Sequence, residues 1–151
     1  MKYYLAYGSN LSVEHMAQRC PDARIVGKAI LQDWKLMFRL HATIEPCKGC
    51  YVPVLVWGIS EDDEKSLDVY EGYPTYYIKL DMKVSMTNLD GQYPQEITAM
   101  IYIMAGKHQS SMPTKNYYDL LTQGYTRFGF DVKILLRALN QALKETREAE
   151  D

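Results

Sequence analysis

The sequence is poor in cysteine and has no long hydrophobic run. Its 151 residues include three cysteines, Cys20, Cys47 and Cys50, and an odd, low number argues against a disulfide framework and fits a reducing compartment. No apolar stretch approaches the roughly 20 residues that are needed to span a bilayer. The amino-terminal segment has a single lysine, Lys2, before a short strand-like run, which is not the pattern of a signal peptide. We therefore expect a cytoplasmic protein that does not insert into a membrane.

An excess of charge of one sign is also lacking. The chain has 17 basic and 19 acidic residues and a formal net charge of −2. Proteins that bind nucleic acids usually present a basic face, so this balance does not support a nucleic-acid partner. Phenylalanine is scarce, with three residues, whereas tyrosine is abundant, with 13. A tyrosine ring is apolar with a polar tip, which suits a partly hydrated pocket as well as the faces of a sheet.

The pattern of hydrophobic residues predicts one α+β domain over residues 1–151, because this length suits a single core. Runs with strand-like alternation are separated by short helices, without the regular βαβ order of a parallel sheet. We expect a mixed, largely antiparallel sheet with short flanking helices, for which a compact barrel is one form. The expected strands are 2–7, 24–31, 34–40, 51–59, 76–86 and 96–105, and the expected helices are 12–20, 60–71, 114–123 and one from Asp131, whose last residues 144–151 form a frayed tail.

The first strand ends in a polar turn, Tyr7-Gly8-Ser9-Asn10. A strand that passes through such a turn into a helix presents several backbone N–H groups, which can bind anionic or carbonyl oxygens. Gly8 has no Cβ and so lets a ligand approach closely, while Ser9 and Asn10 add polar side chains. The alternative is a plain connection in which Asn10 adopts a left-handed backbone conformation and Ser12 caps the helix.

Glu71 falls at the carboxyl end of the predicted helix 60–71, just before Gly72. The negative end of the helix dipole disfavours a carboxylate there and raises its pKa. An acid with a raised pKa, among the tyrosines of segment 70–77, suits a general base that works near neutral pH. The alternative is a solvent-exposed glutamate before a helix cap, with the tyrosines in the core. If the turn and Glu71 serve one site, residues 7–10 and Glu71 line the same cavity.

Three other patterns are weaker candidates for a site. Cys47 and Cys50 have half of the spacing of a zinc site, but four ligands are needed, and the third cysteine and the three histidines are scattered. We expect a loop with two reduced thiols, no structural zinc and no required disulfide. Ser9 and His41 suggest part of a catalytic triad, although nothing supplies an oriented base and Ser9 lacks the context of a nucleophile elbow. Arg39, near the end of a predicted strand, is a weak candidate for holding a substrate carboxylate.

The motifs taken together resemble the γ-glutamylcyclotransferase-like family, which includes the AIG2-like proteins and the γ-glutamylamine cyclotransferases. The matching segments follow the same order along nearly the whole chain, to about residue 130, and the last helix matches less clearly. They are YLAYGSNL at the start, ATIEP at 42–46, VLVWGIS followed by LDVYEG, and then YYIKLDMKV, AMIYIM and YYDLLTQGYTRFGF.

The resemblance implies a small mixed α/β barrel in which the turn and the glutamate meet at one cavity. Family members release 5-oxoproline and a free amine from a γ-glutamyl amide, without water and without a metal or cofactor. The catalytic glutamate of the family corresponds to Glu71. The positions implied for substrate binding, with the rest of the turn, are Tyr4, Leu5, Ala6, Tyr7, Gly8, Ser9, Asn10, Leu11, Tyr102 and Tyr117, the last with Tyr118 beside it.

Two functions remain after these steps. The favoured one is a γ-glutamyl cyclotransferase that acts on a small molecule, and the alternative is a non-catalytic binding or regulatory protein that keeps the cavity. Glu71 favours the enzyme, because a pure binding role does not need a carboxylate at a helix carboxyl end. The sequence leaves open the oligomeric state and the amine portion of the substrate, for which glutathione, γ-glutamyl amino acids, γ-glutamyl-lysine and a biosynthetic γ-glutamyl intermediate are candidates.

Overall fold

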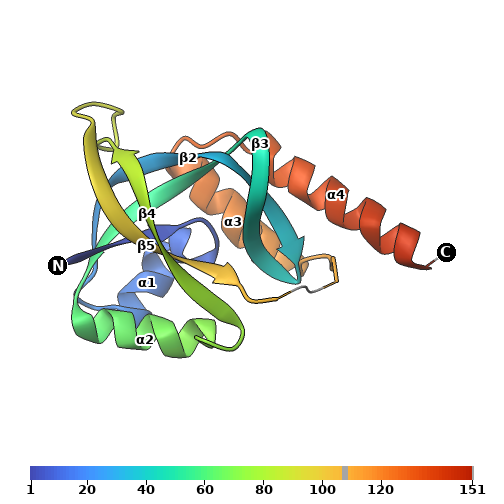
Figure 1. Cartoon of the computed structure of the whole chain (residues 1–151), viewed down its shortest axis with the longest axis horizontal. Coiled ribbons are helices and arrows are strands. Elements are labelled where there is room, and N and C mark those ends of the chain that lie inside the picture. The colour runs from blue at the N-terminus through green and yellow to red at the C-terminus, as the bar shows by residue number, and fades with distance from the viewer. Residues whose placement is uncertain (107–108, 151) are drawn as a thin grey trace.

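The computed structural model describes residues 1–106 and 109–150. Within this part of the chain, five strands form one sheet, and four α-helices and one 3₁₀ turn lie around it (Figure 1). In chain order the elements are β1 (Lys2–Ala6), η1 (Ser9–Leu11), α1 (Val13–Arg19), β2 (Arg24–Arg39), β3 (His41–Ile59), α2 (Glu61–Glu71), β4 (Tyr77–Met86), β5 (Gln95–Met104), α3 (Lys115–Arg127) and α4 (Lys133–Glu150). Among the helices of these residues, none combines the length and the apolar character that a membrane crossing needs. The predicted α+β class is confirmed.

The sheet is mixed and largely antiparallel, as predicted. Its strand order is β2-β3-β1-β5-β4. The central strand β1 pairs antiparallel with β3 and parallel with β5, while β2 with β3 and β4 with β5 form antiparallel pairs. The side chains of Tyr4, Leu5 and Ala6 at the end of β1 are buried. Because β1 is central, the turn that follows it begins in the middle of the molecule.

The sheet is strongly curved but does not close into the barrel that the resemblance implied (Figure 1). Its two edge strands, β2 and β4, meet at an isolated bridge, where Lys28 of β2 and Thr87, just after β4, exchange two backbone hydrogen bonds of 3.0 Å. Next to this bridge the register of β2 shifts between Ile25 and Gly27, and a bulge of this kind bends a strand. The fold is therefore an open sheet whose edges are joined at one point of the described chain.

β2 and β3 form one long hairpin, where the sequence predicted separate strands at 24–31, 34–40 and 51–59. The two strands pair on both sides of a bulge, in which residues 47–50 of β3 lie opposite Asp33 of β2. Polar residues and one glycine at the bulge interrupt the alternation of apolar and polar residues, so the sequence pattern does not show that the strands continue. The paired strands therefore continue beyond the bulge as far as Arg39 and His41, at the tip of the hairpin.

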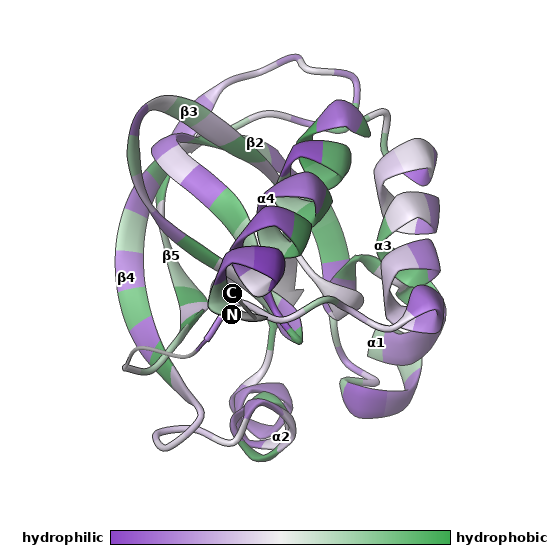
Figure 2. Cartoon of the chain, turned by 90° about the vertical axis from the view of Figure 1, so that its right-hand side faces the viewer, coloured by the Kyte–Doolittle hydropathy of each residue, from purple (hydrophilic) through white to green (hydrophobic). Residues whose placement is uncertain are grey.

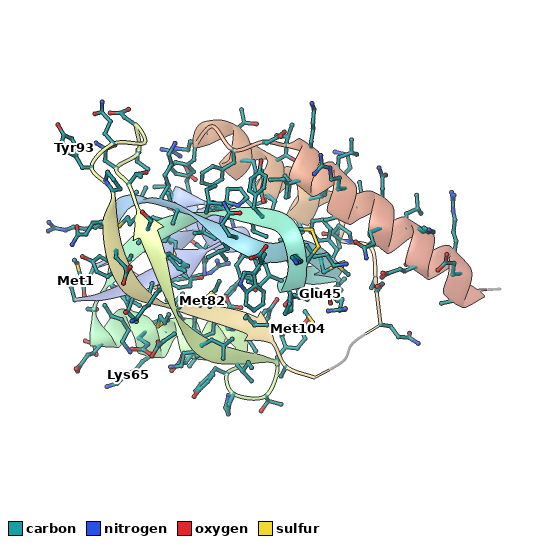
Figure 3. The ribbon with its side chains drawn as sticks, turned by 45° about the horizontal axis from the view of Figure 1, so that its top comes forward. Met1, Glu45, Lys65, Met82, Tyr93 and Met104 are labelled. Atoms are coloured by element: carbon teal, nitrogen blue, oxygen red, sulfur yellow. A yellow bond between two sulfur atoms is a disulfide. The ribbon has the colours of Figure 1, made fainter. Side chains whose placement is uncertain are left out.

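A disulfide between Cys47 and Cys50 closes this bulge (Figure 3). The Asp33 carboxylate also accepts the backbone N–H of Gly49 at 2.9 Å, and Gly49 adopts a φ of +83° that favours glycine. The expectation of two reduced thiols is therefore wrong. The turn within the bulge brings the two sulfur atoms together, which the count of cysteines does not reveal.

α3 is longer than predicted. Thr114 caps its start by accepting the N–H of Tyr117, as the sequence indicated. The helix then continues through Gly124, which the sequence suggested as its end, to Arg127. Gly124 is buried against η1, and a Cβ there would lie 2.7 Å from the Cβ of Leu11. The glycine in this helix therefore permits close packing and does not end the helix.

α4 packs one side against β2. Figure 2 shows hydrophobic and hydrophilic residues alternating along this helix, as in an amphipathic helix. Its buried residues are Ile134, Leu135, Ala138 and Ala142. The helix extends to Glu150 and so includes most of the segment 144–151 for which fraying was predicted; Asp151 lies outside the described residues.

We expect Gly27→Ala to lower the free energy of unfolding, because the edges of the sheet meet beside this residue. A Cβ at Gly27 would lie 2.2 Å from the carbonyl oxygen of Thr87 and 2.8 Å from Cγ of Met86. Overpacking of this kind costs about 1–3 kcal/mol, which urea denaturation at equilibrium measures. Lys28→Ala is the control, since it truncates a side chain and leaves the backbone bridge in place. Equal stability of the two variants would show that this close approach does not constrain the fold.

Candidate active site

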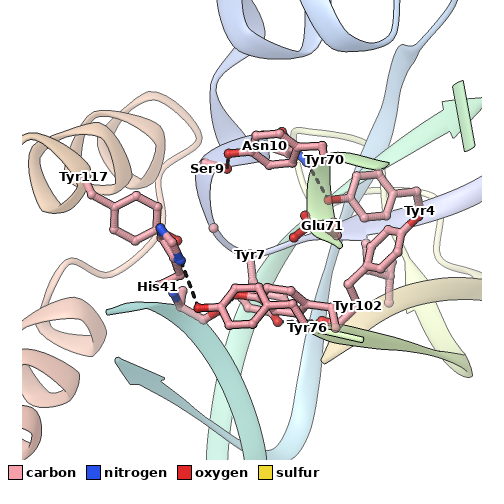
Figure 4. Close-up of a pocket in the computed structure, with 14 residues that line it drawn as sticks. Tyr4, Tyr7, Ser9, Asn10, His41, Tyr70, Glu71, Tyr76, Tyr102 and Tyr117 are labelled. Carbon is pink, nitrogen blue, oxygen red and sulfur yellow. Dashed lines mark hydrogen bonds between the residues drawn. The ribbon is translucent and has the colours of Figure 1, made fainter. Parts of the chain in front are cut away.

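A cavity of about 210 Å³ lies where the turn after β1, the carboxyl end of α2 and the tip of the β2–β3 hairpin meet (Figure 4). Its lining residues are Tyr4, Leu5, Tyr7, Gly8, Ser9, Asn10, His41, Ala42, Tyr70, Glu71, Tyr76, Tyr77, Tyr102 and Tyr117. Glu71 is the one carboxylic acid in this set, and half of the set is tyrosine. The prediction that residues 7–10 and Glu71 line one cavity is confirmed.

The turn after β1 is a single turn of 3₁₀ helix, η1, held on several sides. The N–H groups of Leu11 and Ser12 donate to the carbonyls of Gly8 and Ser9, each at 3.0 Å. The indole N–H of Trp57 donates to the carbonyl of Asn10 at 3.0 Å. The first N–H groups of a helical turn have no partner within that turn, so those of Ser9 and Asn10 are left for other acceptors.

The plain-connection alternative is right about the cap and wrong about Asn10. The hydroxyl of Ser12 accepts the N–H of His15 at 3.2 Å and so caps α1. Asn10, however, is not among the residues with a positive φ. Its side chain is buried and donates to the hydroxyl of Tyr4 at 2.9 Å. This side-chain contact, and not a left-handed backbone, explains the asparagine.

Gly8 allows two neighbouring elements to approach the turn. A Cβ on Gly8 would lie 3.2 Å from the hydroxyl oxygen of Tyr117, which is tighter than most carbon contacts. That hydroxyl accepts the N–H of Ala42 at 3.0 Å, and the hydroxyl of Tyr77 donates to the carbonyl of Ala42 at 2.7 Å. α3 and the tip of the hairpin are thereby fixed beside the turn.

Glu71 is the last residue of α2 and is half-buried at the cavity. Ser60 and Asp63 form a capping box at the start of this helix, and Gly72, with a φ of +66°, ends it in the left-handed conformation. Burial raises the pKa of Glu71 to about 7, and the positive charge of Arg19 opposes this rise. The raised pKa was predicted from the position of Glu71 at the helix end, and burial is the largest cause of it.

The tyrosines of the wall hold their positions through their hydroxyl groups. Tyr7 donates to the carbonyl of Tyr102 at 2.5 Å, and Tyr102 in turn donates to the carboxylate of Asp68 at 2.7 Å. The rings of Tyr4 and Tyr102 meet edge to face, with centroids 5.8 Å apart. Burial raises the pKa of all three tyrosines, so they are neutral hydrogen-bonding groups near pH 7.

Most of the predicted site residues line the cavity, and two do not. Ala6 and Leu11 are buried in the core, and Leu11 packs against α3. Tyr117 lines the cavity, whereas Tyr118 packs against Phe38, with ring centroids 5.9 Å apart. Which of the two adjacent tyrosines serves the site depends on the rotation of α3.

His41 and Ala42 also line the cavity. The sequence suggested His41 only as a triad partner of Ser9, and it did not suggest Ala42. The Nδ1 atom of His41 forms a hydrogen bond of 3.1 Å with the hydroxyl of Tyr76, and its ring meets that of Tyr117 edge to face. Burial lowers the pKa of His41. The sequence signal that could have pointed to them is the ATIEP segment of the resemblance, which begins at Ala42. Without the resemblance, the local sequence indicates only that these residues follow the end of a strand.

The other candidate sites are not assembled. Ser9 bonds to the hydroxyl of Tyr70 at 3.1 Å while His41 bonds elsewhere, so the two do not form a triad. Arg39 is paired with Glu45 at 3.0 Å and lies outside the cavity lining. In the described part of the chain, no group of three or more His, Cys, Asp or Glu side chains could hold a metal ion; His108 lies outside the described residues.

Comparisons with known proteins agree on one family. Residues 4–120 match the sequence model of the family described as gamma-glutamyl cyclotransferase, AIG2-like. The chain is 34% identical over 134 residues to a gamma-glutamylcyclotransferase of Mus musculus, covering 80% of this chain and 68% of the mouse protein. It is 32% identical to that of Homo sapiens, covering 86% and 73%. A solved structure of a gamma-glutamyl cyclotransferase has a TM-score of 0.77 and 29% identity, covering 91% of this chain and 85% of that one.

The raised pKa of Glu71 predicts that stability depends on pH. The unfolded chain loses this proton near pH 4.3, whereas the folded protein keeps it until about pH 7. Stability therefore falls as the pH rises between these values and levels off above them. Glu71→Gln removes this fall, so its free energy of unfolding should rise relative to the wild type by up to about 3 kcal/mol between about pH 4 and pH 7.

Denaturant titrations of both proteins across this pH range provide the measurement. Glu61→Gln, the same change at the exposed start of the same helix, is the control and should leave the pH dependence of the wild type in place. Stability curves for E71Q and wild type that run parallel from pH 4 to pH 8 would contradict a raised pKa at Glu71.

Proposed function

The chain belongs to the AIG2-like γ-glutamyl cyclotransferase family, and from this we propose that it converts a γ-glutamyl amide into 5-oxoproline and a free amine. The nitrogen of the substrate's own α-amino group attacks the γ-carbonyl carbon and closes a five-membered ring. The bond from that carbon to the leaving nitrogen then breaks, and no water is consumed. The observation that carries the proposal is the meeting of the turn 7–10 with Glu71 in one cavity.

Glu71 acts as the proton shuttle in this proposal. An α-amino group has a pKa of about 8 and is mostly protonated at neutral pH, so it must lose a proton before it can attack. A carboxylate with a pKa of about 7 is well matched to take that proton, because a general base works best with a pKa near the working pH. The carboxylic acid formed then donates this proton to the leaving nitrogen. The second proton, which the ring nitrogen loses as the lactam forms, passes through the same carboxylate to the released amine. Neither step needs a metal ion or a cofactor.

The turn supplies hydrogen-bond donors on the other side of the substrate. The γ-carbonyl oxygen gains negative charge as the ring closes, and donors fixed in advance stabilise such charge. The backbone N–H groups of Ser9 and Asn10, at the start of η1, are suited to this oxygen or to the α-carboxylate of the substrate. Their positions are supported by the contacts of the turn with Trp57 and α3.

The tyrosine wall favours the folded shape of the substrate. The chain of a γ-glutamyl group must bend so that its amine and its γ-carbonyl meet, and holding this geometry lowers the barrier. Rings fixed through their hydroxyls, such as Tyr7 and Tyr77, are suited to confine the chain. A non-catalytic binding protein would also use such a wall, but it would not need an acid whose ionisation opposes folding.

The decisive variant is Glu71→Gln, which keeps the size of the side chain and removes its ability to accept a proton. We expect 5-oxoproline release to fall by about 10²–10⁴-fold, while ligand affinity changes little. Turnover is measured on the best substrate from a screen of γ-glutamyl amides, and affinity by calorimetry with the same compound. Glu61→Gln is the control and should keep full turnover. Near-normal turnover in E71Q would exclude Glu71 as the base, and a wild type that binds but does not turn over would favour the binding-protein alternative.

The pH profile of the wild type gives an independent test. The shuttle begins as a carboxylate, so kcat/KM should rise as the pH increases through about 7, where Glu71 ionises. Steady-state rates between about pH 5.5 and pH 9 measure this limb, and the residual activity of E71Q should lack it. A profile that is flat below pH 8 would be inconsistent with Glu71 in this role.

A further inference from the structure

Arg19 occupies a central position among the polar contacts behind the site, although it does not line the cavity. It is the last residue of α1, and its side chain turns toward η1 and α2. One guanidinium nitrogen, Nη1, donates to the side-chain oxygen of Asn10 at 2.5 Å and to the hydroxyl of Ser9 at 3.4 Å. The guanidinium also lies over the ring of Tyr70, 3.5 Å from its centroid.

These contacts close a ring of interactions between three elements. Tyr70 of α2 forms a hydrogen bond of 3.1 Å with Ser9 of η1 through its hydroxyl, while its face carries the guanidinium of Arg19. The side-chain oxygen of Asn10 accepts the hydrogen bond from Arg19, and its side-chain N–H donates to the hydroxyl of Tyr4 of β1. Tyr70 is also the residue before Glu71, so whatever fixes Tyr70 fixes the last turn of α2.

We propose that Arg19 is a positioning residue for the cyclisation: it holds the turn 8–10 and the carboxyl end of α2 at a fixed separation, with Glu71 facing the turn. The proposal rests on the function proposed above. Arg19 acts through Ser9, Asn10 and Tyr70, each of which lines the cavity.

The same placement gives Arg19 an electrostatic role. Its positive charge lowers the pKa of Glu71, against the larger effect of burial. The other titratable groups that line the cavity with Glu71 come from β1 and the turn after it, β3, α2, the end of the α2–β4 connection and the start of β4, β5 and α3. They are Tyr4, Tyr7, His41, Tyr70, Tyr76, Tyr77, Tyr102 and Tyr117. Burial lowers the pKa of His41 and raises that of Tyr117, which keeps both uncharged near pH 7. Arg19 therefore keeps a share of Glu71 in the carboxylate form that begins the reaction.

An arginine suits both roles better than a lysine does. The planar guanidinium can stack on the ring of Tyr70 while its edge donates to two oxygens, whereas a lysine ammonium is a point charge without a plane. Arg19→Lys thus keeps the charge and loses the fixed geometry, and Arg19→Gln loses the charge as well. The pair of variants separates the two contributions.

The experiment compares wild type, R19Q and R19K, with Arg24→Gln, the same change at an exposed residue at the start of β2, as the control. The ionisation of Glu71 is followed directly by the ¹³C chemical shift of its carboxyl carbon, identified by its absence in E71Q. The pH dependence of kcat and KM is measured in parallel, and melting curves show that each variant is folded.

In R19Q we expect the ionisation midpoint of Glu71 to move to higher pH, the rising limb of kcat/KM to move with it, and kcat/KM at pH 7 to fall by about 10–100-fold. We also expect KM to rise in both variants, because neither side chain keeps the stacking on Tyr70. In R19K the midpoint should return toward that of the wild type, because the charge is restored, while KM stays above that of the wild type. R24Q should match the wild type in every reading. A residue that only stabilises the fold would lower the melting temperature and leave the midpoint unchanged.

The outcomes separate the two proposals. An unchanged midpoint in folded R19Q, or an R19K variant with the KM of the wild type, would overturn the role of Arg19 whatever the activity. If the wild type releases no 5-oxoproline from any γ-glutamyl amide, the proposed function fails. In that case, an ionisation midpoint of Glu71 that still moves in R19Q would support the electrostatic coupling of Arg19 to Glu71 independently of the proposed reaction.

Discussion

The site depends on one carboxyl group that is held partly out of water. Burial is the main cause of the raised pKa of Glu71. A buried acid keeps a raised pKa only where no strong positive charge or set of hydrogen-bond donors stabilises its carboxylate form. The wall around it meets this condition, because half of the lining is tyrosine and because the positive charge that acts on Glu71, on Arg19, lies behind the lining and is shared with Asn10 and the ring of Tyr70. The acid is thus left poised between its two protonation states.

Keeping that acid in place also requires hydrogen-bond partners for the polar groups of the wall. Backbone carbonyls meet much of this need: Tyr7 donates to the carbonyl of Tyr102, and Tyr77 to that of Ala42. These bonds run between β1, β3, β4 and β5, so the same hydroxyls that form the wall also join the strands that carry it. The curved sheet, whose edges meet at Lys28 and Thr87, brings these strands close enough to surround the cavity.

Much of the fold followed from local patterns, and its errors have physical causes. The caps at Ser12, Ser60 and Thr114 were recognisable because a hydroxyl before a helix bonds to the helix's own first N–H groups. The errors arose where distant parts of the chain decide. Gly124 does not end α3, because Leu11 needs the space that a side chain would fill. The β2–β3 hairpin is continuous, because pairing resumes beyond the bulge that the bond between Cys47 and Cys50 closes.

The sequence by itself determined the identity of the acid and of the turn, since Tyr7-Gly8-Ser9-Asn10 and the glutamate before Gly72 are local features with a chemical meaning. Their meeting in one cavity was inferred from the joint presence of both motifs, and the tertiary structure confirms it. The resemblance named Tyr117 for the site, and the structure places Tyr117, and not the adjacent Tyr118, in the cavity lining. Only the tertiary structure decided what else joins the acid and the turn: His41 from the tip of the hairpin and Arg19 behind the wall. Burial, stacking and charge act through space between segments far apart in the chain, and no local pattern of residues records those distances.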